Sequence, residues 1–395
     1  MKTRTKRMLL LSLCVALLAV CGVFAFAATD TEYKVVDHVV YQLIPAREQT
    51  EAHYIIVKLF DSEEAKAGVK KLVIPSQIDG IPVTEIYCEN SYTDPYRNLS
   101  VKKIVLPDTI QVIGEKAFMH MLSLRNINIP SSVVSIGPFA FSSCKGLKQI
   151  TISESVETIE DCAFRDCHHL EQIHFLGNGL KHIGKEAFYK SRALKQISFP
   201  ASLEMMERSA FTYSGLETVH IPGKCVVGYD AFMYCHSLKK VVFEDRTDEN
   251  GLFVLPAAFS YCSALEKVYL PKHSVGFGPL GSVFEGCRNL KAVYRTTHLR
   301  DIGYHAFYLC QSLTSFTIPA EIQSIHRTVF SGCTSLKKLR VLATDPTFLN
   351  QDEKSGLFLK KLPKNCKIYV KTETMQQAFL DAGCTNSVIV KADLA

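Results

Sequence analysis

The chain has 395 residues, more than one hydrophobic core usually holds, so several domains or a repeated unit are expected. Hydrophobic residues make up 47% and charged residues 21%, which is ordinary for a folded protein and excludes a disordered one. The 45 Lys and Arg residues against 39 Asp and Glu residues give a formal net charge of +6.

The first 27 residues have the pattern of a secretory signal peptide. Basic residues stand between Lys2 and Arg7, an apolar run extends from Met8 to about Phe26, and Ala25-Phe26-Ala27 matches an A-x-A cleavage site. The length of the apolar run also approaches that of a membrane anchor. Leu18-Ala19-Val20-Cys21 resembles a lipobox, although Val20 is large for that position. The small residues at the cleavage site favour a signal peptide over residues 1–27, and we expect no membrane-spanning segment after its removal.

Most of the positive charge belongs to this predicted signal. Without residues 1–27 the chain has 41 basic and 39 acidic residues, a net charge of +2. Nucleic-acid-binding proteins usually have a strongly basic patch and a high isoelectric point. We therefore expect no nucleic-acid partner.

One pattern, I-G-x-x-A-F-x-x-C-x-x-L-x-x-I-x-I-P, recurs through the rest of the chain. Clear copies run over Ile136–Ile152 and Ile302–Pro319, and an earlier copy between Leu72 and Pro107 keeps only the strand-like ends. The phenylalanines of the pattern, here called anchor phenylalanines, are 21 to 27 residues apart. They are Phe118, Phe141, Phe164, Phe188, Phe211, Phe232, Phe259, Phe284, Phe307 and Phe330.

Each copy contains the elements of one turn of a stacked coil. Ile150 and Ile152 alternate as one face of a strand does, and the stretch Val133–Ile136 suits a second short strand. Ala140 and Phe141 are expected in the interior. One unit cannot bury its own apolar side, whereas stacked units share a continuous core. The sequence therefore predicts a mainly β repeat solenoid of about eleven units of about 23 residues.

These motifs resemble the BspA-type leucine-rich repeats of bacterial surface and secreted proteins, over roughly residues 70–345. The predicted hairpin Tyr41–Leu59 is similar to the N-terminal cap of that family, and Lys367–Val370 with Thr374–Ala382 is similar to its strand-helix C-terminal cap. We expect a signal peptide at 1–27, an N-terminal cap at 28–68, the leucine-rich-repeat solenoid at 69–345 and a C-terminal cap at 346–395. The resemblance implies extracellular binding, often to host proteins or other cells, and leaves the partner open.

Seven cysteines stand three residues after an anchor phenylalanine. Other repeats have Met121, Ser191 or Ser214 at this position, which favours small buried filler over disulfide partners. Export would permit disulfides, so pairing between stacked neighbours is the alternative. The seven are Cys144, Cys167, Cys235, Cys262, Cys287, Cys310 and Cys333.

No set of residues indicates catalysis or metal binding. The densest Cys/His group spans Cys162 to His174, but Cys167 is expected to point inward and His174 outward, whereas a zinc site needs convergent ligands. The sequence contains no G-x-S-x-G, H-E-x-x-H or P-loop motif. We expect no enzymatic activity, no metal and no cofactor.

Two residues per repeat strand are expected to point outward on the concave side. Of the 22 positions from Lys103 to Arg340, none is acidic and five are Lys or Arg. Exposed strands disfavour Asp and Glu in general, so a merely solvated face is one explanation. Tyrosines beside cations are common binding anchors, and amides beside aromatic rings suit a glycan. The candidate ligand-binding residues are Gln172, His174, Gln196, His220, Lys240, Lys267, Tyr269 and Tyr294.

The combined features predict an exported, non-catalytic binding or adhesion module, secreted or associated with the cell surface. Its expected partner is an extracellular protein or a glycan. The alternative is a self-associating structural component of the cell envelope or matrix, which would use exposed sheet or cap edges.

Overall fold

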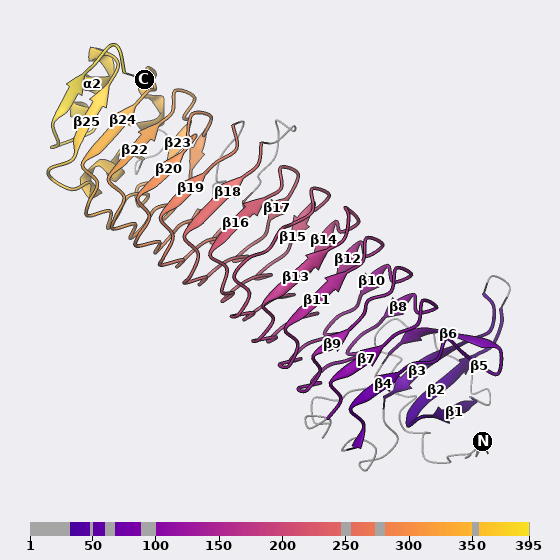
Figure 1. Ribbon diagram of the computed structural model, residues 1–395. Helices are drawn as coiled ribbons and strands as arrows, with labels where there is room; N and C mark the ends of the chain where they lie inside the picture. The colour runs from indigo at the N-terminus through magenta and orange to yellow at the C-terminus, as the bar shows by residue number, and fades with distance from the viewer. Residues whose placement is uncertain are drawn as a thin grey trace, which may run out of the picture.

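The structure, a computed structural model, describes residues 32–47, 50–59, 68–87, 100–245, 254–272, 281–349 and 355–394. The predicted signal peptide, residues 1–27, lies outside these ranges. The chain winds into an elongated β-solenoid of about 12 turns, with the predicted N-terminal cap at one end and the C-terminal cap at the other (Figure 1). This architecture confirms the predicted fold class.

One side of the solenoid is formed by parallel strands that we call the front row. Its strands pair in register within four successive sheets, so that Ile150 lies beside Ile173 and Val241 beside Val268 on the neighbouring strand. The row consists of β4 (Lys71–Val73), β7 (Lys103–Val105), β9 (Asn126–Ile127), β11 (Gln149–Ile152), β13 (Gln172–Phe175), β16 (Thr218–Ile221), β18 (Lys240–Phe243), β19 (Lys267–Tyr269), β20 (Ala292–Tyr294), β22 (Ser315–Ile318), β24 (Lys338–Val341), β25 (Lys367–Val370) and β26 (Val388–Val390).

A second row of mostly two-residue strands, the back row, lies behind it (Figure 1). It begins with the antiparallel strands β1 (Tyr33–Val36), β2 (Val39–Ile44) and β3 (His53–Lys58), which confirm the predicted N-terminal hairpin. It continues in parallel through β6 (Ile81–Ile86), β8 (Val112–Ile113), β10 (Ser135–Ile136), β12 (Thr158–Ile159), β14 (His182–Ile183), β15 (Met205–Met206) and β17 (Val226–Val227). Strand β5 (Gln77–Ile78) pairs with β6, and β21 (Asp301–Ile302) pairs with β23 (Ser324–Ile325).

The C-terminal cap combines two 3₁₀ turns, η3 (Pro346–Leu349) and η4 (Ser355–Lys361), with one helix, α2 (Glu373–Asp381). Thr372 caps the helix, since its hydroxyl accepts a hydrogen bond from the Met375 amide at 3.1 Å. Met375 and Phe379 bury the inner side of the helix. The cap thus has the predicted strand-helix form.

The turns that contain the anchor phenylalanines form a third backbone ladder between repeats. Phe139 and Ser143 have left-handed backbone angles, with φ of 55° and 59°. Phe139, Phe141 and Ser143 donate their amides to carbonyls of the next repeat at 2.7 to 2.9 Å. The left-handed residues therefore point every second amide along the solenoid axis. The hydrogen bonds that these amides form offset the conformational free energy that a left-handed backbone costs.

The anchor phenylalanines stack into one continuous column inside the solenoid. Rings from Phe118 to Phe259 lie 5.0 to 5.3 Å apart, and those from Phe259 to Phe330 lie 5.8 to 6.0 Å apart. All of these side chains are fully buried. Each ring from Phe141 to Phe307 therefore packs against the anchor rings of both neighbouring repeats, in the interior position that the sequence predicts.

The repeated cysteines are more than filler. The eleven described cysteines are buried thiols. All seven thiols of the repeated position donate to the carbonyl of the anchor phenylalanine in the preceding repeat, at 3.1 to 3.2 Å. At the same position Ser191 has a shorter side chain, and its buried hydroxyl has no hydrogen-bond partner among the described residues. The thiol therefore suits this position because it fills space and reaches the carbonyl.

The front row is interrupted where residues 195–199 form no strand, although the sequence predicts one there. The following repeat is the shortest, with 21 residues between Phe211 and Phe232. Its turn lies so close to the preceding one that a Cβ on Gly215 would be 2.0 Å from the Arg192 carbonyl oxygen. The interruption therefore lies next to a close approach of two consecutive turns.

Asn128 ends β9 early. Its side-chain oxygen accepts from the Leu106 amide and its side-chain nitrogen donates to the Leu106 carbonyl, both at 2.9 Å. The side chain thereby replaces the backbone pairing that would otherwise continue from β7 to β9. Asn126 and Asn128 are both exposed, but only Asn128 has its side-chain polar atoms bonded to the backbone of the neighbouring strand in the described structure.

Stability is expected to fall at alkaline pH because the core needs protonated thiols. Burial raises the pKa of the Cys167 and Cys333 thiols to about 12, against about 8.5 for an unfolded cysteine. Their contribution is complete below a pH of about 8.5 and is lost as the pH rises toward the folded pKa, by up to about 1.4 kcal/mol per pH unit for each thiol. Thermal unfolding under reducing conditions at a series of alkaline pH values measures this slope.

The double variant Cys167→Ser/Cys333→Ser is the control for that slope. Serine occurs naturally at the equivalent Ser191 and Ser214, and its hydroxyl does not ionise in this range. The variant should lose less stability between neutral and alkaline pH than the wild type. If stability fell equally with pH in both proteins, the fall would not come from ionisation of these two thiols.

Replacing Asn128 by alanine should destabilise the solenoid by about 1–3 kcal/mol, because the Leu106 backbone groups lose their partners. Asn126→Ala is the matched control and should change stability by no more than about 0.5 kcal/mol. Hydrogen exchange at the Leu106 amide locates the effect. Unchanged protection of that amide in Asn128→Ala would show that the side chain does not pair there.

Candidate functional site

Two columns of side chains point away from the core along the front row. In β13 the residues Gln172 and His174 are exposed while Ile173 between them is buried. Parallel pairing in register aligns the same two positions from strand to strand. We call these aligned positions the outward columns. No acidic residue occupies them in the front-row strands that the structure describes.

Four of the eight predicted residues, Lys240, Lys267, Tyr269 and Tyr294, form what we call the tyrosine–lysine cluster. Register places Lys240 beside Lys267 and Tyr269 beside Tyr294. The tyrosine rings stack with centroids 4.6 Å apart and an interplanar angle of 14°. The Lys240 ammonium lies 5.3 Å from the Tyr269 ring centroid, within the range of a cation–π contact. The cluster therefore presents an ordered aromatic pair beside two cations on an open sheet.

The other four predicted residues do not join this cluster. On β13, His174 Nε2 lies 3.3 Å from Gln172 Oε1. Gln196 is exposed, but it lies in the interruption of the front row. His220 on β16 is exposed and faces Val242 in register. The predicted set thus divides into a polar pair, two separate side chains and the tyrosine–lysine cluster.

Acidic residues lie beside the outward columns, in the turns just before the front-row strands. From Lys148 to Lys291, lysine and glutamate alternate at this turn position from one repeat to the next. Ion pairs join Lys148 to Glu171 at 3.7 Å, Lys239 to Glu217 at 3.3 Å and Lys291 to Glu266 at 3.0 Å. Each is exposed and contributes little stability. The carboxylates therefore neutralise lysines of the turns and leave the cations of the columns uncompensated.

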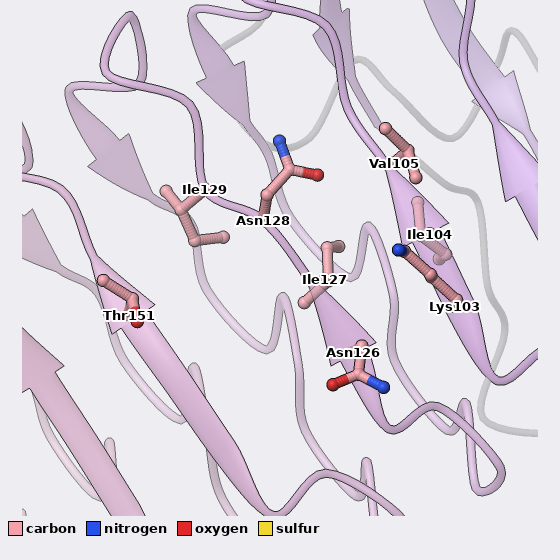
Figure 2. Close-up of a pocket in the computed structure, with 8 residues that line it drawn as sticks. All are labelled: Lys103, Ile104, Val105, Asn126, Ile127, Asn128, Ile129 and Thr151. Atoms are coloured by element: carbon pink, nitrogen blue, oxygen red, sulfur yellow. The ribbon is translucent and has the colours of Figure 1, made fainter.

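A shallow open hollow lies on the same face, between β7, β9 and β11. Figure 2 shows Lys103 and Val105 on one strand, Asn126 and Asn128 on the next, and Thr151 across the gap. The hollow is located where Asn128 ends β9 early. It is thus a break in the sheet, and both polar atoms of the Asn128 side chain are already bonded to Leu106.

The structure also contains a tyrosine ladder that the sequence analysis missed. Tyr213, Tyr234 and Tyr261 stack along the turn edge, with centroids 4.9 and 5.2 Å apart. The Tyr261 hydroxyl donates to Glu285 at 2.7 Å, and this hydrogen bond raises the pKa of Tyr261 to about 12. The signal in the sequence is a tyrosine two residues after the anchor phenylalanine in three consecutive repeats. Because the rings stack on one another, most of the area of their faces is covered by neighbouring rings of the ladder.

The Cys/His group of the sequence analysis does not converge. Cys167 donates into the core to the Phe141 carbonyl, whereas His169 Nδ1 lies at the surface 2.8 Å from the Lys145 carbonyl oxygen. Within the described ranges no three His, Cys, Asp or Glu residues are grouped so that they could hold a metal. The same ranges contain no helix with the length and hydrophobicity needed to cross a bilayer.

Several solved protein structures resemble this one. A leucine-rich repeat protein from Bacteroides ovatus has a TM-score of 0.53 at 22% identity, covering 93% of this chain and 100% of its own. A leucine rich cell surface protein from Faecalibacterium prausnitzii has a TM-score of 0.46 at 22% identity, covering 84% and 100%. The pneumococcal vaccine antigen PcpA has a TM-score of 0.41 at 19% identity, covering 91% and 98%. At such identities the likeness concerns the fold alone.

No curated protein matches the sequence. The family described as BspA type leucine rich repeat region matches in six copies, over residues 92–216, 176–275 and 254–350. These overlapping matches run without a break from residue 92 to residue 350, and so through most of the solenoid. The chain therefore belongs to the BspA-type leucine-rich repeat family.

Proposed function

We propose that this protein is an exported, non-catalytic binding or adhesion module that recognises an extracellular protein or a glycan. The family supports a repeat-based interaction module, and solenoids of this kind offer long continuous binding surfaces. The predicted signal peptide supports export, to the medium or the cell surface. The binding surface in this proposal is the pair of outward columns over residues 172–294.

The observation that carries the proposal is the tyrosine–lysine cluster. Tyrosines bury large area at low entropic cost, and they are enriched among residues that dominate binding energy. Tyr269 and Tyr294 are already ordered by their mutual stacking at 4.6 Å, and Tyr294 is 40% exposed. A ligand that contacts the pair therefore pays little for ordering it.

The upstream part of the columns extends the surface with polar groups. Gln172, His174, Gln196 and His220 are all exposed, and their amides and imidazoles can both donate and accept hydrogen bonds. Such groups suit hydroxyl-rich sugars as well as peptide backbones. A ligand that spans both parts would contact the polar residues at one end and the aromatic pair at the other.

The double variant Lys240→Glu/Lys267→Glu should weaken binding of the true ligand by at least about tenfold, since it reverses both charges of the cluster. The purified protein is screened against arrays of extracellular-matrix proteins and glycans. Each hit is then measured with the variant at two salt concentrations. A salt-sensitive hit that the variant loses supports the proposed site.

Lys185→Glu/Lys224→Glu is the matched control, because both lysines are exposed outside the outward columns and the charge change is the same. This control should bind as the wild type does. A hit that neither variant affects would place the ligand on another surface. No hits, together with concentration-dependent assembly of the protein alone, would favour the self-associating envelope or matrix component instead.

A further inference from the structure

A second group of cations lies at the C-terminal end of the front row. Register places Lys338 on β24 beside Lys367 on β25, and Arg340 beside Tyr369. Lys391 directly follows β26, whose Ile389 is paired with Tyr369. We call Lys338, Arg340, Lys367, Tyr369 and Lys391 the C-terminal cation cluster. It gathers four positive charges around one aromatic ring.

The ring holds two of these cations in place. The Lys338 ammonium lies 4.9 Å from the Tyr369 ring centroid, and the Lys391 ammonium lies 5.6 Å from it. Both contacts are in cation–π range. They restrict two long side chains that would otherwise sample many rotamers. A ligand that binds these ammonium groups therefore loses less side-chain entropy than it would on an ordinary lysine-rich surface.

The four cations lack acidic partners in the described part of the chain. Lysines of the front-row turns differ in this respect, since Lys148, Lys239 and Lys291 each pair with a glutamate. Cations that share a surface without carboxylates repel one another. An anion that binds there would relieve this repulsion and gain attraction to all four charges.

The cluster is separate from the tyrosine–lysine cluster. Between them the outward columns contain the uncharged residues Ala292 on β20, and Ser315 and Thr317 on β22. Neighbouring strands lie about 4.8 Å apart. The two clusters are thus distinct places on one face, and each can be altered without the other.

We propose that the C-terminal cation cluster binds an acidic polysaccharide, a linear sugar chain with sulfate or carboxylate groups. The cations lie across the open face of the parallel strands β24, β25 and β26. An open row of charges suits a polymer better than a small enclosed anion. The inference is independent of the ligand proposed for residues 172–294.

The scarcity of exposed apolar groups distinguishes this partner from a protein or a membrane. Protein interfaces usually need a buried aromatic or aliphatic anchor, and peripheral membrane binding needs apolar side chains that enter the bilayer. Tyr369 is only half-exposed, with two ammonium groups beside its ring, and the exposed large hydrophobic residues of the described chain lie outside the cluster. An acidic polysaccharide can bind through the positive charges of the cluster and does not need an apolar anchor.

The test measures binding of the purified protein to heparin as a sulfated polysaccharide and to neutral dextran. Polyglutamate stands for an acidic peptide, and vesicles containing phosphatidylglycerol stand for an anionic membrane. Lys338→Gln/Lys367→Gln removes two charges from the cluster, and Lys185→Gln/Lys224→Gln makes the same change at exposed lysines outside the outward columns. Tyr369→Leu removes the ring and leaves every charge in place. Circular dichroism and thermal unfolding verify that each variant is folded.

The expected result is salt-sensitive binding to heparin and none to dextran. Lys338→Gln/Lys367→Gln should weaken heparin binding at least tenfold, Tyr369→Leu should weaken it several-fold, and Lys185→Gln/Lys224→Gln should change it less than twofold. No heparin binding, or equal losses in the two lysine variants, would overturn the proposal. Polyglutamate or vesicles that bind as tightly as heparin would overturn the choice of a polysaccharide. If Lys338→Gln/Lys367→Gln does not fold, heparin binding is measured with Tyr369→Leu and Lys391→Gln instead. Each of these should lose more heparin binding than the control lysine variant.

Discussion

Stacking of each turn on the next is the interaction on which the rest of this structure depends. Anchor rings lie about 5 to 6 Å from the rings of both neighbours, thiols donate to carbonyls one repeat away, and the backbone pairs mainly across repeats in the front row, the back row and the anchor turns. A single turn has few contacts of its own. Stability therefore accumulates through nearest-neighbour interfaces.

The same constraint produces the candidate binding surface. Because strands pair in register from one repeat to the next, a residue type that recurs at one outward position becomes a line along the solenoid. Lys240 and Lys267 become neighbours in this way, as do Tyr269 and Tyr294. The outward residues contribute little to the core, so the fold places few limits on their chemistry. The surface can thus be polar near β13, aromatic and basic near β19, and basic again at β24 and β25.

The sequence is sufficient to predict the parts of the structure that repeat. Spacing and residue type identify the anchor phenylalanines, the inward cysteines and the outward alternation of strands such as β13, because each signal is present many times. The sequence is less informative where one repeat departs from the others. Asn128 has the same position as exposed residues in other repeats, and only its contact with Leu106 shows that it replaces backbone pairing. Tyr369 and Lys391 follow a segment without the repeat motif, so their alignment with Lys338 depends on the three-dimensional register.

The thiol column makes the chain chemically most vulnerable before it is folded. In the finished stack the seven repeat thiols are buried and engaged with backbone carbonyls, so an oxidant in solution has little access to them. A chain whose repeats have not yet stacked exposes the same sulfur atoms at regular intervals. Disulfides formed at that stage between cysteines of non-adjacent repeats would join layers that do not contact one another in the finished stack. For this protein, folding and oxidation are therefore competing reactions, and protection comes from completing the stack first.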